Sequence, residues 1–75
     1  MFWLNISRST GAWKLHKENC RFCTPKETSL KGLNELKHDG GWIEVDSYNS
    51  AYEYYKLNHH DNEYWQPCKV CKPEL

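Results

Sequence analysis

Hydrophobic and polar residues alternate over two stretches near the start of the chain, residues 2–6 and 13–16. A period of two is typical of β-strands that bury one face. The run Ser9-Thr10-Gly11 separates the two stretches and favours a turn, so we expect them to pair as an N-terminal β-hairpin. In the second strand, His16 points away from the side that faces the core.

A helix is predicted over residues 24–39. Thr24 offers a capping hydroxyl, Pro25 suits the first helical position, and Glu27 lies three residues after the cap. Along this segment leucine recurs at every third position, as Leu30, Leu33 and Leu36. The glycine pair at 40–41 would end the helix, because glycine readily adopts the left-handed conformation common at helix C-termini.

A short strand and a second helix are predicted after these glycines. Residues 42–45 alternate again, and Asp46 or Ser47 can cap the helix that follows. Hydrophobic side chains recur along that helix with the spacing of a single stripe, at Tyr48, Ala51, Tyr52 and Tyr55. Tyr54 and Leu57 lie off the stripe. The expected fold is therefore a small α+β domain with a hairpin, one further strand and two helices.

The length and charge of the chain narrow its class. With 75 residues it forms one domain, residues 1–75, and a chain of this size buries only about 60 to 65% of its unfolded surface, so it needs a staple. No apolar run approaches the roughly 20 residues that span a bilayer, and the start of the chain does not follow a secretory pattern. We therefore expect a cytoplasmic protein with reduced thiols and no membrane partner. Ten basic residues balance ten acidic ones, which leaves no global positive field.

The four cysteines form two identical Cys-x-x-Cys units at residues 20–23 and 68–71. Each unit can bring two thiolates to one ion at about 2.3 Å, and two units complete a closed tetrahedral zinc site. The spacing thus predicts one structural Zn²⁺ bound by Cys20, Cys23, Cys68 and Cys71. Four thiolates and one divalent ion would change the formal net charge from 0 to −2.

Most of the chain from Trp13 onward resembles the small metal-binding domain of the Ada methylphosphotriester repair family. The likeness rests chiefly on residues 64–73, Tyr-Trp-Gln-Pro-Cys-Lys-Val-Cys-Lys-Pro, and also on residues 15–20 and on the helix start at 45–47 followed by Ala51. The resemblance implies an α+β domain with a metal between an early cysteine turn and the late knuckle. In Ada itself, a zinc-bound thiolate accepts a methyl group from a DNA phosphotriester.

The position that matches the methyl-accepting cysteine of this family is His16, four residues before Cys20. An imidazole cannot supply the activated thiolate, so Ada-type repair is not expected. The same match makes His16 the alternative to Cys23 as fourth ligand, and a fold without metal is a third possibility. We favour Cys23, because its two-residue spacing closes a knuckle like the one at Cys68.

Basic residues gather in sequence around the two knuckles: Lys14, Lys17, Arg21, Lys69 and Lys72. Together with Trp13, Phe22 and Trp65 they favour a nucleic-acid-binding module for DNA or RNA, in which phosphates meet lysines and bases stack on rings. The alternative is that these cations only offset the charge of the thiolates.

Two other functions remain open. Tyr54 and Leu57 would suit a protein-interaction adaptor, and an electron-rich zinc-thiolate centre, through Cys20 or Cys23, would suit an alkyl acceptor. No catalytic arrangement is apparent and four protein ligands would close the zinc site, so we do not predict an enzyme. The run His59, His60, Asp61 and Glu63 is expected in a solvated loop.

Overall fold

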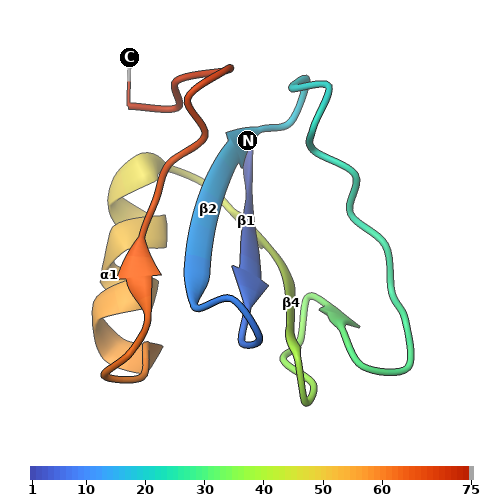
Figure 1. Cartoon of the computed structure of the whole chain (residues 1–75). Helices are drawn as coiled ribbons and strands as arrows, with labels where there is room; N and C mark the ends of the chain where they lie inside the picture. The colour runs from blue at the N-terminus through green and yellow to red at the C-terminus, as the bar shows by residue number, and fades with distance from the viewer. Residues whose placement is uncertain (75) are drawn as a thin grey trace.

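The protein folds as a five-stranded mixed sheet with one helix packed on it (Figure 1). The computed structural model describes residues 1–74. The helix, α1, spans Tyr48–Asn58. The strands lie side by side in the order β3-β4-β1-β2-β5. Their bounds are β1 Phe2–Ser7, β2 Ala12–Lys17, β3 Gly32–Leu33, β4 Gly40–Val45 and β5 Tyr64–Trp65.

The strands β1 and β2 pair antiparallel, with Leu4 opposite Leu15 and Asn5 opposite Lys14. On its other side β1 pairs antiparallel with β4. The expected N-terminal hairpin is therefore not a separate unit. It is the centre of a larger sheet, whose edges β3 and β5 each run parallel to their neighbours.

The apolar core lies between the sheet and α1. Its fully buried side chains come from alternate positions of β1 and β2 and from one helix position: Leu4, Ile6, Trp13, Leu15 and Ala51. Tyr54 and Tyr55 pack on Trp13 with ring centroids 6.0 and 5.3 Å away. Burying one such large side chain contributes about 1.5–3 kcal/mol. Tyr54 is thus a core contact rather than a free surface residue, whereas Leu57 is 81% exposed.

The second predicted helix forms as α1, and Ser47 caps it by accepting a hydrogen bond from the Ser50 amide at 3.1 Å. The prediction of a first helix over residues 24–39 is wrong. This segment runs without helix from the end of β2 to β4 and contains only the short β3. In the middle of this segment the hydroxyl of Thr28 accepts hydrogen bonds from the Lys31 and Leu30 amides at 3.0 and 3.3 Å, and the side chain closes a turn there.

Close backbone packing explains why this segment is not helical. Gly32 pairs with Gly41 across β3 and β4, and a Cβ atom at either glycine would collide with the Glu35 carbonyl oxygen. The glycines therefore permit a close approach of two strands, and they do not end a helix. Leucines spaced strictly by three also drift around a helix by about 60° per step, so they cannot hold one face. In the structure Leu30 and Leu33 are 55% and 38% exposed.

Glu63 belongs to the loop that joins α1 to β5, which we expected to be solvated, but the residue is buried. Its carboxylate pairs with Arg8 and accepts hydrogen bonds from Trp13 Nε1 and the His60 amide, both at 2.9 Å. Burial alone would raise the pKa of Glu63, but these donors and the charge of Arg8 outweigh it and hold the pKa below its usual value. This network anchors the loop to the core.

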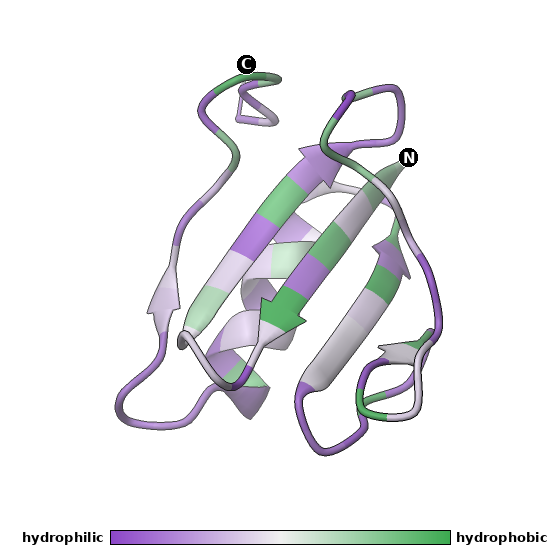
Figure 2. Ribbon diagram, turned by 45° about the vertical axis from the view of Figure 1, so that its right-hand side comes forward, coloured by the Kyte–Doolittle hydropathy of each residue, from purple (hydrophilic) through white to green (hydrophobic). Residues whose placement is uncertain are grey.

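The face of the sheet opposite α1 is not covered by a helix, as Figure 2 shows for the broad central strands. Asn5, Lys14 and His16 lie on this outer face, because they alternate with the core residues of β1 and β2. His16 therefore points away from the core, in agreement with the sequence, yet it is only 4% exposed. Its ring lies 5.9 Å from that of Trp42, and the cysteine turns cover it on the other side.

Candidate metal centre

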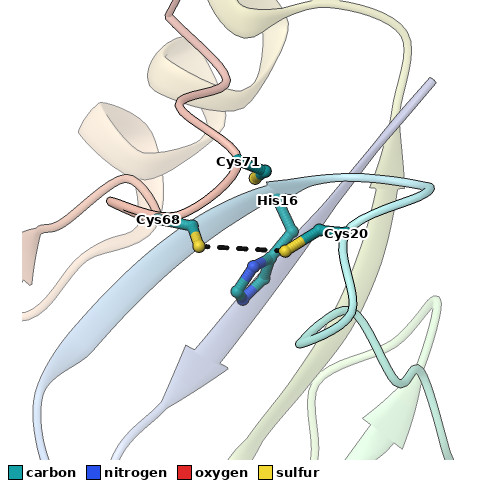
Figure 3. A group of neighbouring side chains, drawn as sticks. All are labelled: His16, Cys20, Cys68 and Cys71. Atoms are coloured by element: carbon teal, nitrogen blue, oxygen red, sulfur yellow. Dashed lines mark hydrogen bonds between the residues drawn. The ribbon is translucent and has the colours of Figure 1, made fainter.

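Four side chains converge at one end of the outer face: His16, Cys20, Cys68 and Cys71 (Figure 3). One ligand atom from each lies within 4.8 Å of all the others. The sulfur atoms of Cys20 and Cys68 are 3.9 Å apart. Two thiolates on a tetrahedral zinc with bonds of about 2.3 Å would be about 3.8 Å apart. This group has the dimensions of a metal site and could hold a metal ion.

The local backbone explains how two ligands come from the end of β2. His16 is the penultimate residue of this strand. The chain then reverses in a tight turn, in which the Cys20 amide donates to the Lys17 carbonyl at 3.0 Å. This turn brings the Cys20 thiol back over the outer face, beside the imidazole (Figure 3).

The other two ligands arrive on the segment that begins with β5. Its amides donate to the carbonyls of β2 in a regular parallel ladder that continues past the strand: Tyr64 to Gly11 at 2.8 Å, Gln66 to Trp13 at 2.9 Å and Cys68 to Leu15 at 2.9 Å. The last of these bonds places Cys68 next to His16. The chain then turns, with the Lys72 amide donating to the Cys68 carbonyl at 3.1 Å, and Cys71 comes back to the same point.

Backbone amides surround two of the sulfur atoms. The Lys17 amide donates to Cys71 Sγ at 3.3 Å, and the amides of Val70 and Cys71 donate to the sulfur of Cys68. Burial alone would raise the pKa of the Cys68 thiol, but these donors outweigh it and lower that pKa. Amide donors of this kind fix metal-bound thiolates in place.

The shifts in the pKa of Cys71 and of His16 both favour the neutral form. Burial, followed by the nearby sulfurs of Cys20 and Cys68, raises the pKa of Cys71 to about 11. Burial, followed by the charge of Lys14, lowers the pKa of His16. A neutral imidazole keeps the lone pair that a metal needs, and a cation beside Cys71 would favour its thiolate.

One unsatisfied atom tests whether a metal fits this group. His16 Nδ1 is buried and has no hydrogen-bond partner among residues 1–74. A buried polar atom without a partner is costly, and bonding to a metal would remove that cost. In Figure 3 the imidazole lies directly beneath the sulfurs of Cys20 and Cys68. The residues present therefore fit a bound ion.

Cys23, the fourth ligand favoured by its spacing, is not in the convergent group. Its amide donates to the Cys20 carbonyl at 2.9 Å, and its side chain is partly buried beside the cluster. Burial, together with the negative charges of Cys20 and Glu18, raises the pKa of the Cys23 thiol. The alternative ligand, His16, lies with the three other cysteines instead. The signal for it was its place four residues before Cys20.

The basic residues named from the sequence do not all line one cleft. Lys14 and Lys69, together with Phe22, line a cleft of about 400 Å³ beside the cluster. His16 and Cys68 form one wall of this cleft. The other predicted contacts, Lys17, Arg21 and Lys72, do not line it, although Arg21 lies over the Phe22 ring at 5.1 Å. Asn5 and Gln66 also line the cleft, and the sequence pattern gave no sign of either.

No protein-family model, curated protein or solved structure matches this chain. The resemblance to the Ada family therefore stays a prediction from the quoted residues. Within residues 1–74, no helix has the length and apolar character needed to cross a membrane.

Proposed function

We propose that the protein is a structural zinc module in which His16, Cys20, Cys68 and Cys71 bind one Zn²⁺. The convergence of these four ligand atoms within 4.8 Å, three of the residues being buried, is the observation that carries the proposal. A set of three thiolates and one imidazole is a common structural zinc set, and four protein ligands leave no position for a substrate. Three thiolates with one divalent ion would give a formal net charge of −1.

The role of the ion follows from what it would connect. It would tie the turn after β2 and the segment after β5 to the outer face, where no helix contributes apolar contacts. Structural zinc binds with an apparent free energy of about 10–16 kcal/mol at neutral pH in small domains. That is enough to decide whether a chain of this size folds.

Metal analysis of matched variants tests the ligand set. We expect one equivalent of zinc in the parent protein and in Cys23→Ser, and less in His16→Ala and Cys68→Ser. Cobalt substitution should give the visible bands of a tetrahedral thiolate site in the parent and in Cys23→Ser alone. Loss of the metal in Cys23→Ser with retention in His16→Ala would reverse our assignment, and a parent without metal would refute the module.

Nucleic-acid binding is the second candidate function. Lys14, Lys69 and Phe22 around one cleft favour it, as does the resemblance to a DNA repair domain. Because the chain is neutral overall, binding would be local and sensitive to salt. Replacing both Lys14 and Lys69 by Ala should abolish DNA binding at low salt, whereas Lys56→Ala on α1 should not. Equal binding by all three proteins would contradict this function.

A further inference from the structure

The cleft beside the metal centre contains a second unsatisfied polar atom. Asn5 Oδ1 is buried and has no hydrogen-bond partner among the described residues. Asn5 lies in the middle of β1 and lines the cleft opposite the cysteine turns. A buried acceptor without a donor is uncommon in native proteins and often marks a place that a ligand occupies. A matching ligand must therefore bring an N–H or O–H group.

Other polar groups line the same cleft. If Nδ1 of His16 binds the metal, Nε2 carries the hydrogen and becomes a donor. The amide of Gln66 can both donate and accept, and it lines the same cleft. The polar groups of the cleft thus suit a ligand edge on which donors and acceptors alternate, as they do on the edge of a nucleobase.

The other walls suit the remaining parts of a nucleotide. Phe22 and Val70 are 51% and 55% exposed and form an apolar wall. Lys14 and Lys69 provide two cations at the rim. A smaller hollow of about 210 Å³ adjoins the cleft through the shared residues Asn5 and Lys14, and it is lined by Ser7, Thr10 and Lys31. Hydroxyl and ammonium groups of this kind bind phosphate oxygens.

We propose that the outer face of the sheet binds one nucleotide, free or within a single strand, with its base in the cleft and its phosphate on the lysines. The base packs against Phe22, and the Asn5 amide, whose Oδ1 is buried in this structure, turns to accept an N–H from the base. A cleft of about 400 Å³ falls within the range of about 300–1,000 Å³ of small-molecule sites. A base paired in a duplex cannot enter such a cleft, so the site selects unpaired bases.

This proposal rests on the proposed zinc site, because the metal would assemble the cleft. Phe22 comes from the turn that holds Cys20, and Lys69 and Val70 lie between the two late cysteines. His16 and Cys68 belong to both the metal group and the cleft wall. Removal of the metal frees both turns, so the nucleotide and the metal should each strengthen binding of the other.

The test uses zinc-loaded protein of measured metal content and a fluorescein-labelled oligothymidylate, followed by fluorescence anisotropy. We expect binding to the single strand, little binding to the same length of duplex, and loss of binding after chelation. Asn5→Ala and Phe22→Ala should each weaken binding about tenfold, which corresponds to about 1.4 kcal/mol, the size of one buried hydrogen bond or one stacked base. Lys56→Ala serves as the control on the opposite side of the molecule. Competition by thymidine monophosphate would identify a free nucleotide as sufficient, and its failure would assign the site to a strand.

Several outcomes would overturn the proposal. Fully metallated protein that binds neither the oligothymidylate nor thymidine monophosphate would refute nucleotide binding in the cleft and leave the zinc module intact. Equal binding to duplex and single strand, with no effect of Asn5→Ala or Phe22→Ala, would indicate phosphate contact alone. Unchanged binding after chelation would refute the coupling to the metal. Protein without any bound zinc would instead refute the proposed module, and metal analysis of the same sample identifies that case.

Discussion

The two faces of the sheet bury different kinds of side chain. On the face toward α1, alternate residues of β1 and β2 are apolar and completely buried, with Leu4 and Trp13 among them. On the outer face, the intervening residues include Asn5, Lys14 and His16 as well as Trp3, and two turns that carry cysteines cover His16. The first face gains its free energy by removing apolar surface from water. The second face carries buried groups that are unfavourable alone, and a bound ion would make their burial favourable.

Burial therefore has opposite consequences on the two faces. A buried Leu15 is satisfied as it stands, since it has no polar group. A buried His16 with a free Nδ1 is incomplete. The helix-facing side is therefore a complete apolar core, whereas the outer side contains two buried polar atoms, His16 Nδ1 and Asn5 Oδ1, that have no hydrogen-bond partner among the described residues. Perturbing each side separately should give different stability changes.

Metal removal should cause the largest change. With a strong chelator, or in Cys68→Ser, we expect the free energy of unfolding to fall by at least about 5 kcal/mol, comparable to the whole stability of a small domain. Hydrogen exchange should show protection lost first in residues 18–31 and 66–74, which the ion would hold. If thermal unfolding and exchange are unchanged without metal, the outer face is stable by itself and the comparison fails.

Truncating the core should have the next largest effect. Trp13 is fully buried and packs against the rings of Tyr54 and Tyr55. Trp13→Ala should cost about 3–5 kcal/mol in chemical denaturation of the metal-loaded protein. Leu57→Ala, at a position 81% exposed, is the control and should change stability by less than about 0.5 kcal/mol. Similar values for the two variants would show that the core is misassigned.

The buried pair between Arg8 and Glu63 should contribute less than the core and should depend on pH. Glu63→Gln should destabilise the protein by about 3 kcal/mol at neutral pH, because the side chain of Arg8, mostly buried, loses its charged partner. The pKa of Glu63 is held below its usual value of 4.5, so the carboxylate stabilises the fold above that pH and loses its effect as the pH falls through the folded-state pKa.

The difference between parent and Glu63→Gln, measured by denaturation at each pH, should therefore shrink on acidification below pH 4.5. Comparing the two proteins at the same pH separates this effect from acid release of the metal, which both share. A difference that stays constant with pH would mean that the carboxylate is not charged in the fold.

Asn5→Ala should produce the smallest change, and in the opposite direction. Since Asn5 Oδ1 has no partner, removing it should leave stability unchanged or raise it by about 1 kcal/mol. The same substitution should weaken nucleotide binding. A gain in melting temperature together with a loss of affinity would mark Asn5 as a residue kept for binding. Clear destabilisation would show that its side chain supports the fold.

Patterns over a few neighbouring residues predicted the elements that depend mainly on local sequence. Alternation located β1, β2 and β4, and the stripe beginning at Tyr48 after the Ser47 cap located α1. The predicted helix over residues 24–39 is wrong because its signals are local, whereas the close approach of Gly32 and Gly41 depends on the pairing of β3 with β4, which in turn pairs with β1 near the start of the chain. From the sequence alone, a glycine pair cannot show whether it ends a helix or allows two strands to approach closely.

The candidate site was predictable only in part, for a related reason. Spacing identified Cys20, Cys68 and Cys71 as a group. The identity of the fourth member depends on the turns at residues 17–23, which spacing alone does not specify. In the structure His16, near the end of β2, lies in the cluster and Cys23 does not. Asn5 reaches the cleft through strand pairing, and no motif contains it, whereas Gln66 lies within the run at residues 64–73 but offered no sign there of a cleft.

Both outermost strands of the sheet, β3 and β5, are only two residues long. A long, flat outer strand invites pairing with a neighbouring molecule, because it presents a row of unused amides and carbonyls. Here β3 is brief, and the segment that begins with β5 pairs only as far as Cys68 before it turns away. Concentrated solutions of the folded protein should therefore resist growth into fibrils, and any self-assembly would have to proceed through side chains.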